Sequence, residues 1–229
     1  NTDVYYMEKG ERKLLLKFRR NCISSPLIRT GWKSYKDLAK PSRGRGASAG
    51  PIATDSAYWK KRNLVKTNKW STGYLKEDGT ESKMKVNNQV ASNPIGFYES
   101  ASNFCKLPCR LTHFTRTNYD KYQEGLPFIQ RISEMFQKLI PDSYTKQLEK
   151  ANLKPHLKIP ETCFSTITIN RNFRTACHKD AGDYKDGFGN LTVIERGKYH
   201  GGYTVFPQFG VGVDARSGDF LAMDVHQWH

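Results

Sequence analysis

Two residues near the end of the chain have the spacing of a metal-binding pair. His178 and Asp180 flank a single lysine in the sequence His178-Lys179-Asp180. On a β-strand, side chains two residues apart point to the same face, so this imidazole and this carboxylate can reach one metal ion. A second histidine would complete a set of two histidines and one carboxylate, which leaves positions open on an iron(II) ion for O2 and a co-substrate. By itself the motif is short and arises often by chance.

Two histidines at the C-terminal end are candidates for the third ligand. The apolar run of residues 220–225 follows a Gly-Asp turn and is followed in its turn by His226 and His229. His229 lies 51 residues after His178, which leaves room for the intervening strands of a barrel. Because His226 and His229 are three residues apart, alternation along a regular strand cannot point both toward one site.

The residues around these candidates have the pattern of short β-strands. Residues 163–169 are rich in β-branched and aromatic types, which predicts a strand. Further strands are predicted over residues 174–178, 191–195, 203–206, 211–214 and 220–225, with Gly and Asp turns between them. Several short strands at close intervals indicate a jelly roll, or double-stranded β-helix. A nucleotide-binding α/β fold is not expected, since no glycine-rich phosphate loop joins a strand to a helix.

Helical periodicity precedes these strands. From Leu126 to Ile140 the apolar residues recur at spacings of three and four, which predicts an amphipathic helix. Pro127 suits the first turn of this helix and Pro141 its end. A second, shorter helix is predicted from Asp142. We therefore expect an α+β protein in which a jelly-roll core is backed by helices.

Positive charge is concentrated in the front half of the chain. Residues 1–90 contain 20 Lys or Arg and 8 Asp or Glu, a balance of +12, whereas residues 91–229 contain 17 and 14, a balance of +3. This asymmetry favours a polyanionic partner, with nucleic acid ahead of an anionic membrane surface. Solubility, or binding to an acidic protein, is the alternative. We expect two regions, a basic and loop-rich one over residues 1–90 and a second one over residues 91–229.

Candidate nucleic-acid contacts lie within the basic region. Residues 40–51 form a predicted loop that contains Arg43 and Arg45, and Lys60-Lys61-Arg62 follows shortly afterwards. Aromatic residues alternate with these cations, a combination that can stack bases and follow phosphates. The same residues could equally be solvated charge over a loop-rich layer.

The cysteines and the chain ends bear on the cellular setting. The five cysteines are odd in number and widely spaced, which favours reduced thiols inside the cell over a secreted disulfide framework. A zinc site at Cys105 and Cys109 with His113 lacks an evident fourth ligand. We expect neither a membrane helix nor a secretory signal. The start at Asn1, without Met, suggests a fragment or a processed chain.

One stretch resembles a known family. Residues 170–183, the following Gly189-Asn190-Leu191, the Gly201-Gly202-Tyr203 and Gly218-Asp219-Phe220 segments and the Trp228-His229 end are similar to the Tet/JBP family of dioxygenases. The resemblance is good over about residues 160–229 and extends back to about residue 40. Members of this family hydroxylate the 5-methyl group of thymine or 5-methylcytosine in nucleic acid, with Fe(II), O2 and normally 2-oxoglutarate.

The resemblance assigns roles to particular residues. His178 and Asp180 match the proximal metal ligands, and His229 matches the distal histidine, with His226 as its rival. The family normally binds the far carboxylate of 2-oxoglutarate with an arginine beyond the distal histidine, and this chain stops at His229. We expect truncation there, and the alternative is an incomplete co-substrate site. Arg174 is a candidate for gripping that carboxylate, or for a salt bridge to a nearby aspartate. Asp183 is a candidate for lining the pocket, or for capping a turn.

The resemblance implies a Fe(II)/2-oxoglutarate-dependent dioxygenase that acts on a pyrimidine methyl group in DNA. A methyl group inside a duplex is out of reach, so the base must be flipped or single-stranded. The first alternative is a protein hydroxylase that acts on prolyl or lysyl side chains with the same metal centre. The second is a non-catalytic nucleic-acid-binding or structural protein that retains the barrel. The sequence leaves open thymine against 5-methylcytosine, DNA against RNA, the extent of oxidation and the oligomeric state.

Overall fold

The computed structural model describes residues 1–38, 40–42, 45–49, 65–66, 74–75, 90–98, 110–180 and 182–229. They form two compact units. The first comprises Asn1–Leu38, Pro94–Ile169 and Lys179–His229, and the second comprises Ala39–Asn93 and Asn170–His178. The prediction of a mixed protein with helices and antiparallel strands is confirmed.

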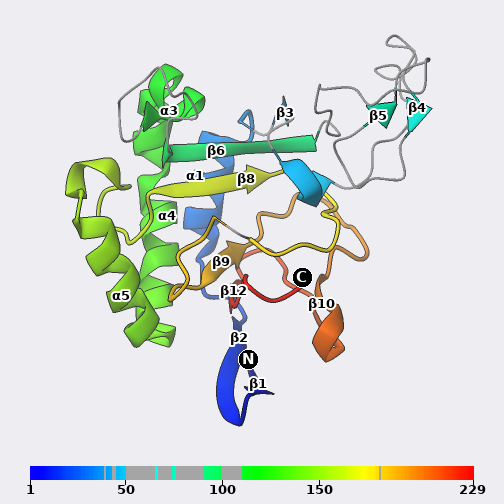
Figure 1. Cartoon of the computed structure of the whole chain (residues 1–229). Helices are drawn as coiled ribbons and strands as arrows, with labels where there is room; N and C mark the ends of the chain where they lie inside the picture. The colour runs from blue at the N-terminus through cyan, green and yellow to red at the C-terminus, as the bar shows by residue number, and fades with distance from the viewer. Residues whose placement is uncertain are drawn as a thin grey trace. The chain divides into compact units, whose positions relative to one another are not determined.

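The main sheet of the first unit joins the two ends of the chain. Its order is β1-β2-β12-β9, with every neighbouring pair antiparallel. The bounds are β1 Thr2–Glu8, β2 Glu11–Arg19, β9 Gly189–Thr192 and β12 Phe220–Met223. In Figure 1 the blue hairpin of β1 and β2 therefore lies beside the red strand β12. The first and last parts of the sequence are thus neighbours in one sheet.

A register shift interrupts the β1–β2 hairpin. Val4 is opposite Leu16, but the next residue, Tyr5, is opposite Leu14, so Leu15 is the extra residue of a β-bulge. The carbonyl oxygen of Leu15 accepts a hydrogen bond from the backbone N–H of Asp224 at 2.8 Å. The bulge therefore extends the pairing of β2 one residue beyond the end of β12.

The elements before residue 36 were not expected from the sequence. Residues 1–90 were predicted to be loop-rich, yet β1, β2 and helix α1 (Ser25–Tyr35) occupy much of residues 2–35. Leu15 and Leu16 are buried where β2 pairs on both sides, and Leu14 is partly buried. The charges beside them pair across the hairpin, as Arg19 Nη1 and Asp3 Oδ1 do at 2.6 Å. Tertiary pairing outweighed the local composition here.

Helices cover one face of the main sheet. The helices of this layer are α1, α3 His113–Thr117, α4 Tyr119–Leu139 and α5 Pro141–Asn152. Their apolar residues share a core cluster with Phe220 and Ala222 of β12. Two glycines let α1 and α4 approach closely, because a Cβ atom on Gly125 would lie 2.1 Å from the Tyr35 hydroxyl and one on Gly31 would lie 2.9 Å from the Phe128 ring. The helical backing predicted from the sequence is confirmed.

The helix boundaries differ from the prediction at one end. The structure ends α4 at Leu139 and begins α5 at Pro141, as the sequence indicated. However, α4 begins at Tyr119, so Pro127 lies inside the helix and the expectation that it begins the helix was wrong. Tyr122 is buried, and the apolar stripe therefore continues for one more turn towards the N-terminus. That packing offsets the one backbone hydrogen bond that an internal proline removes.

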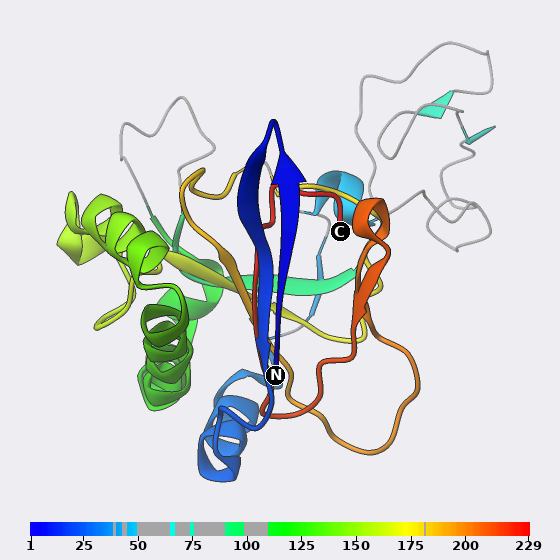
Figure 2. The same ribbon diagram turned by 90° about the horizontal axis from the view of Figure 1, so that it is seen from below.

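A two-stranded sheet covers the other face. Strands β10 (Thr204–Phe206) and β11 (Val211–Val213) pair antiparallel, joined through the 3-10 turn Pro207–Phe209. Phe206 and Val213 share a second core cluster with Leu16, Phe18 and Leu221. Figure 2 shows the green helices on one side of the blue β1–β2 hairpin and the orange strands on the other. The strands predicted over residues 203–206, 211–214 and 220–225 are present and slightly shorter than predicted. The strand predicted over residues 191–195 overlaps β9, which begins earlier, at Gly189, and ends at Thr192.

The remaining described elements are strands and 3-10 turns outside the main sheet and its helices. Strand β6 (Val90–Tyr98) pairs with β3 (Pro41–Ser42), with β7 (Arg110–Leu111) and with β8 (Thr166–Asn170), which is part of the strand predicted from residue 163. The short strands β4 (Val65–Lys66) and β5 (Tyr74–Leu75) pair with each other, and 3-10 turns occupy Gly46–Ala49 and Pro155–Leu157. Within the described ranges, none of the helices has the length and apolar character needed to cross a bilayer.

Candidate metal centre

The C-terminal segment leaves the sheet through a turn built on Asp224. After β12, the N–H of Gln227 donates to the carbonyl of Asp224 at 3.2 Å. The Asp224 carboxylate accepts hydrogen bonds from the Tyr6 hydroxyl at 3.1 Å, from Gln227 Nε2 at 3.3 Å and from the backbone N–H of His226 at 3.0 Å. These hydrogen bonds fix the shape of the turn that leads to His229.

The segment that carries the other two candidates is irregular. Residues 171–180 form neither helix nor strand, so the predicted strand over residues 174–178 was wrong. A strand needs a ladder to one partner, whereas the N–H of Ala176 donates to Ser48 at 2.9 Å and that of Asp180 to Val225 at 3.0 Å. Strand alternation is therefore not what brings His178 and Asp180 together.

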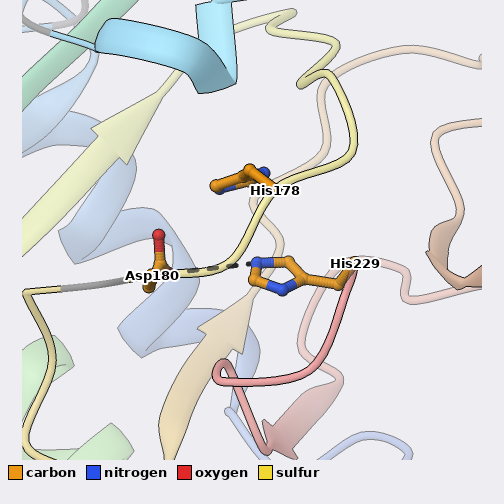
Figure 3. Close-up of side chains that lie close together, drawn as sticks. All are labelled: His178, Asp180 and His229. Carbon is orange, nitrogen blue, oxygen red and sulfur yellow. Dashed lines mark ion pairs between the residues drawn. The ribbon is translucent and has the colours of Figure 1, made fainter.

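The structure brings His178, Asp180 and His229 together (Figure 3). Each offers one ligand atom, and these atoms lie within 4.8 Å of one another. His229 Nε2 and Asp180 Oδ2 are 3.9 Å apart. The His229 side chain is 7% exposed and the Asp180 side chain 41%, so the cluster has a covered side and a side open to solvent.

Both histidines are held in the form that binds a metal through Nε2. The His178 Nδ1 atom lies 2.8 Å from the carbonyl oxygen of Ala176, and the His229 Nδ1 atom lies 3.0 Å from that of Gln227. A carbonyl oxygen can only accept, so each Nδ1 carries the proton and each Nε2 carries the lone pair. Carbonyls that orient metal-binding imidazoles in this way are common around protein metal sites.

His226, the rival of His229, has a different environment. Its Nδ1 atom is 3.2 Å from Asp224 Oδ1, and it does not belong to the group of His178, Asp180 and His229. The ring of His229, in contrast, packs near Phe206 with 6.2 Å between ring centroids. The geometry favours His229 over His226 as the third ligand.

The two residues considered for the co-substrate are both at the surface. Arg174 is exposed and lies in the irregular stretch before His178. Asp183 is also exposed. Partial desolvation of its carboxyl group raises its pKa, and the nearby Asp180 carboxylate raises that pKa further. Their roles stay predictions.

The predicted nucleic-acid contacts fall mostly outside the described residues. Arg43, Lys60, Lys61 and Arg62 lie there, as do Cys105 and Cys109 of the zinc alternative. Arg45 is described, and its Nε atom donates to the Ser92 hydroxyl at 2.5 Å within the second unit. Since Arg45 is partly buried, it has a structural role besides any contact with phosphate.

Sequence reasoning missed the side chains that form hydrogen bonds in the turn before His229. Tyr6, Asp224 and Gln227 surround the turn before His229. Asp224 and Gln227 could have been suspected from their place between the apolar run and His229. Tyr6 could not, because it is more than 200 positions away from Asp224 in the sequence.

One protein family matches more than half of the chain. The Tet/JBP family, described as the oxygenase domain of the 2OGFeDO superfamily, matches residues 93–229. The chain belongs to this family. The resemblance predicted from residues 170–183 and 189–191 is therefore confirmed, and the prediction of a dioxygenase is supported.

This Tet/JBP chain is similar to several thymine dioxygenases. It is 32% identical over 155 residues to JBP2 of Trypanosoma cruzi, a bifunctional helicase and thymine dioxygenase. The matched region is 66% of this chain and 14% of that protein. It is 32% identical over 135 residues to JBP2 of Leishmania tarentolae, covering 59% and 12%. A thymine dioxygenase of Trypanosoma cruzi, JBP1-A, is 33% identical over 138 residues, covering 60% and 16%. The matched region is thus a small part of each relative.

Proposed function

We propose that the chain is a Fe(II)- and 2-oxoglutarate-dependent dioxygenase domain that hydroxylates the 5-methyl group of a pyrimidine in DNA. The observation that carries the proposal is the convergence of His178, Asp180 and His229 in a member of the Tet/JBP family. Among pyrimidines we propose thymine, because the relatives are named thymine dioxygenases. Those names also favour a nucleic-acid substrate over the prolyl or lysyl side chain considered as an alternative.

The residues present fit an iron(II) ion. Two imidazole nitrogens and one carboxylate oxygen are the donor set of non-haem iron(II) oxygenases, and they leave further coordination positions open. Both imidazoles are in the tautomer that offers Nε2, and the donor atoms lie within 4.8 Å of one another. We propose His178, Asp180 and His229 as the three ligands. With O2 and 2-oxoglutarate, Fe(II) would supply the oxidising power for a methyl C–H bond, one oxygen atom entering the methyl group and the other the co-substrate, which leaves as succinate and CO2.

The protein's own groups orient the imidazole rings of the proposed site and exclude water from one side of it. The Ala176 and Gln227 carbonyls hold the two imidazoles, while Phe206 and the strands below it exclude water from the covered side. We propose Arg174 as a grip for the far carboxylate of 2-oxoglutarate and Asp183 as a residue that lines the pocket. Arg174 can offer two parallel N–H donors to a carboxylate.

The rest of the fold enters the proposal as support for the site. The main sheet and the β10–β11 hairpin enclose one core cluster, as the two sheets of a double-stranded β-helix would. We propose that this jelly-roll core belongs to a catalytic region over residues 91–229, and that the basic region over residues 1–90 contacts DNA. Its candidate contacts are Arg43, Arg45, Lys60, Lys61 and Arg62.

The experiment is a turnover assay that compares oligonucleotides differing in a single base, one of which lacks the methyl group. The protein is loaded anaerobically with Fe(II) and 2-oxoglutarate, and then mixed with O2 and single-stranded or duplex oligonucleotides. Three matched oligonucleotides contain one thymine, one uracil or one 5-methylcytosine at the same position. Mass spectrometry of the digested nucleosides measures the product.

The expected result is 5-hydroxymethyluracil from the thymine oligonucleotide, with no change in the uracil one and none with the His178→Ala variant. Product from 5-methylcytosine alone would move the substrate to cytosine and keep the enzyme class. Turnover of 2-oxoglutarate without any oxidised base, on every oligonucleotide, would contradict the proposal.

A further inference from the structure

A polar cluster from both ends of the chain lies behind the candidate metal centre. It consists of Tyr6 on β1 and of Asp224 and Gln227 in the turn after β12. Gln227 Nε2 donates to the Tyr6 hydroxyl at 3.0 Å and to Asp224 Oδ2 at 3.3 Å, and the Tyr6 hydroxyl donates to the same Oδ2 at 3.1 Å. The three side chains therefore form a closed ring of hydrogen bonds.

This cluster fixes the turn that carries His229. The backbone carbonyl of Gln227 accepts from His229 Nδ1 at 3.0 Å, and the side chain of the same Gln227 is held by Tyr6 and Asp224. A shift of Gln227 would therefore move the acceptor that sets the rotation of the His229 ring. The cluster acts on His229 through one residue.

The same turn also holds Asp180. The backbone N–H of Asp180 donates to the carbonyl of Val225 at 3.0 Å, and Val225 follows Asp224 directly. Asp224 is itself anchored to the bulge of β2 through its N–H and Leu15. Two of the three proposed ligands thus depend on one short turn, and its shape depends on Tyr6 and the Asp224 carboxylate.

Tyr6 is well placed to be the fixed point of this arrangement. Its ring packs near Phe209 with 5.0 Å between centroids, and it lies on a strand that is paired along its whole length. It also lies outside residues 93–229, the region matched by the family. Tyr6 is therefore a contribution of this chain's N-terminal hairpin and not of the family-matched region.

We propose that Tyr6, with Asp224 and Gln227, is a positioning residue for the metal centre, and that it sets the affinity and geometry of the metal bound by Asp180 and His229. The proposal rests on the proposed function, since it takes these residues as metal ligands. Neighbouring groups that orient metal ligands are worth about 10- to 100-fold in metal affinity when they are removed.

The test is a Co(II) titration of Tyr6→Phe, with Tyr5→Phe as its matched control. Co(II) uses the same ligand types as Fe(II), and its visible bands report the coordination geometry. Both variants remove one hydroxyl from the same strand and keep the ring, but Tyr5 points to the opposite face, where Arg12 lies 3.9 Å from its ring. Thermal melting of the metal-free proteins measures any general loss of stability.

We expect Tyr6→Phe to bind Co(II) about tenfold more weakly than wild type, with a changed visible spectrum, and Tyr5→Phe to bind as wild type does. Gln227→Met, which keeps the length of the side chain and the backbone carbonyl, should reproduce the effect. If Tyr6→Phe and Gln227→Met bind Co(II) with wild-type affinity and spectrum, the positioning role is overturned, even if their melting temperatures fall.

The wild-type titration separates this proposal from the proposed function. Stoichiometric Co(II) binding that is lost in His178→Ala supports the metal centre, and the Tyr6 result then decides the positioning role alone. If wild type binds no Co(II), the metal centre itself is wrong, and the role of Tyr6 fails with it.

Discussion

The two segments that supply the proposed metal ligands are supported in different ways. Residues 220–223 form a strand with every residue buried, and the turn that follows is held by side-chain hydrogen bonds before the chain reaches His229. Residues 171–180 have no helix or strand, alternate between exposed and partly buried positions, and supply His178 and Asp180. The proposed site therefore combines a residue that follows a buried strand with two residues from a segment without regular secondary structure.

Because of this difference, we expect metal binding and the free energy of unfolding to depend on different segments of the chain. Substitutions in the irregular segment should affect metal binding with little effect on folding, because few buried contacts depend on it. Substitutions in β12 should lower the free energy of unfolding. The following predictions test that separation, from the largest expected effect to the smallest.

Asp180→Ala should abolish turnover and leave the metal-free fold intact. Removing one of three ligands takes away the contribution of the metal, so we expect the rate of product formation to fall by about 1000-fold or more. The side chain is 41% exposed, so metal-free melting temperature should change by no more than about 2 °C. Mass spectrometry of the digested nucleosides measures the rate of product formation. Circular dichroism melts with and without Co(II) measure the stability of the fold and the binding of metal, since Co(II) should raise the melting temperature of wild type and not of the variant. A large drop in the metal-free melting temperature would show that the irregular segment also supports the fold.

Phe220→Ala should show the opposite behaviour. Phe220 is fully buried in the core cluster shared by helices and sheet, and its removal should cost about 3–5 kcal/mol of unfolding free energy. Urea denaturation of the metal-free protein measures this cost. Phe220→Leu, which fills more of the same space, serves as the control and should cost less. Equal stability of Phe220→Ala and wild type would mean that β12 does not anchor the C-terminal ligand.

Asp183→Asn should give a small, pH-dependent gain in stability. Desolvation of the carboxyl group and the charge of Asp180 raise the pKa of Asp183 in the folded protein. The folded state therefore binds the Asp183 proton more tightly than the unfolded chain does. Its ionisation therefore lowers stability as the pH rises from the unfolded pKa of about 3.9 through the higher folded pKa, and the full penalty is present at pH 7. The asparagine variant should melt slightly above wild type at pH 7 and together with it near pH 3, without metal. A gain that persists near pH 3 would assign it to something other than charge.

The sequence was informative where pattern and packing agree. The apolar spacing of residues 126–140 predicted the core of α4, and the apolar or β-branched runs near residues 204–206, 211–213 and 220–223 predicted three strands. At each of these places the local preference and the burial point to the same structure. The family resemblance located His178, Asp180 and His229 through short motifs, and the structure brings those three together.

The remaining features depend on contacts distant in sequence. Nothing local in residues 2–19 indicates that β2 pairs with β12, because its leucines are flanked by arginines and lysines. The strand predicted over residues 174–178 has the right residue types but no neighbouring strand to pair with. Pro127 sits inside α4 because Tyr122 packs into the core one turn earlier, which no boundary rule for proline anticipates.

The pairing of β2 with β12 has a consequence for how the protein folds as it is synthesised. The first hairpin emerges from the ribosome about 200 residues before its partner strand, and loop closure over such a separation is slow. Until β12 arrives, Leu16 and Phe18 lie on an unpaired strand edge of the kind that promotes association between chains. A chaperone that shields this hairpin during translation should therefore raise the yield of folded protein, and removing the hairpin would leave the edge of β12 unpaired instead.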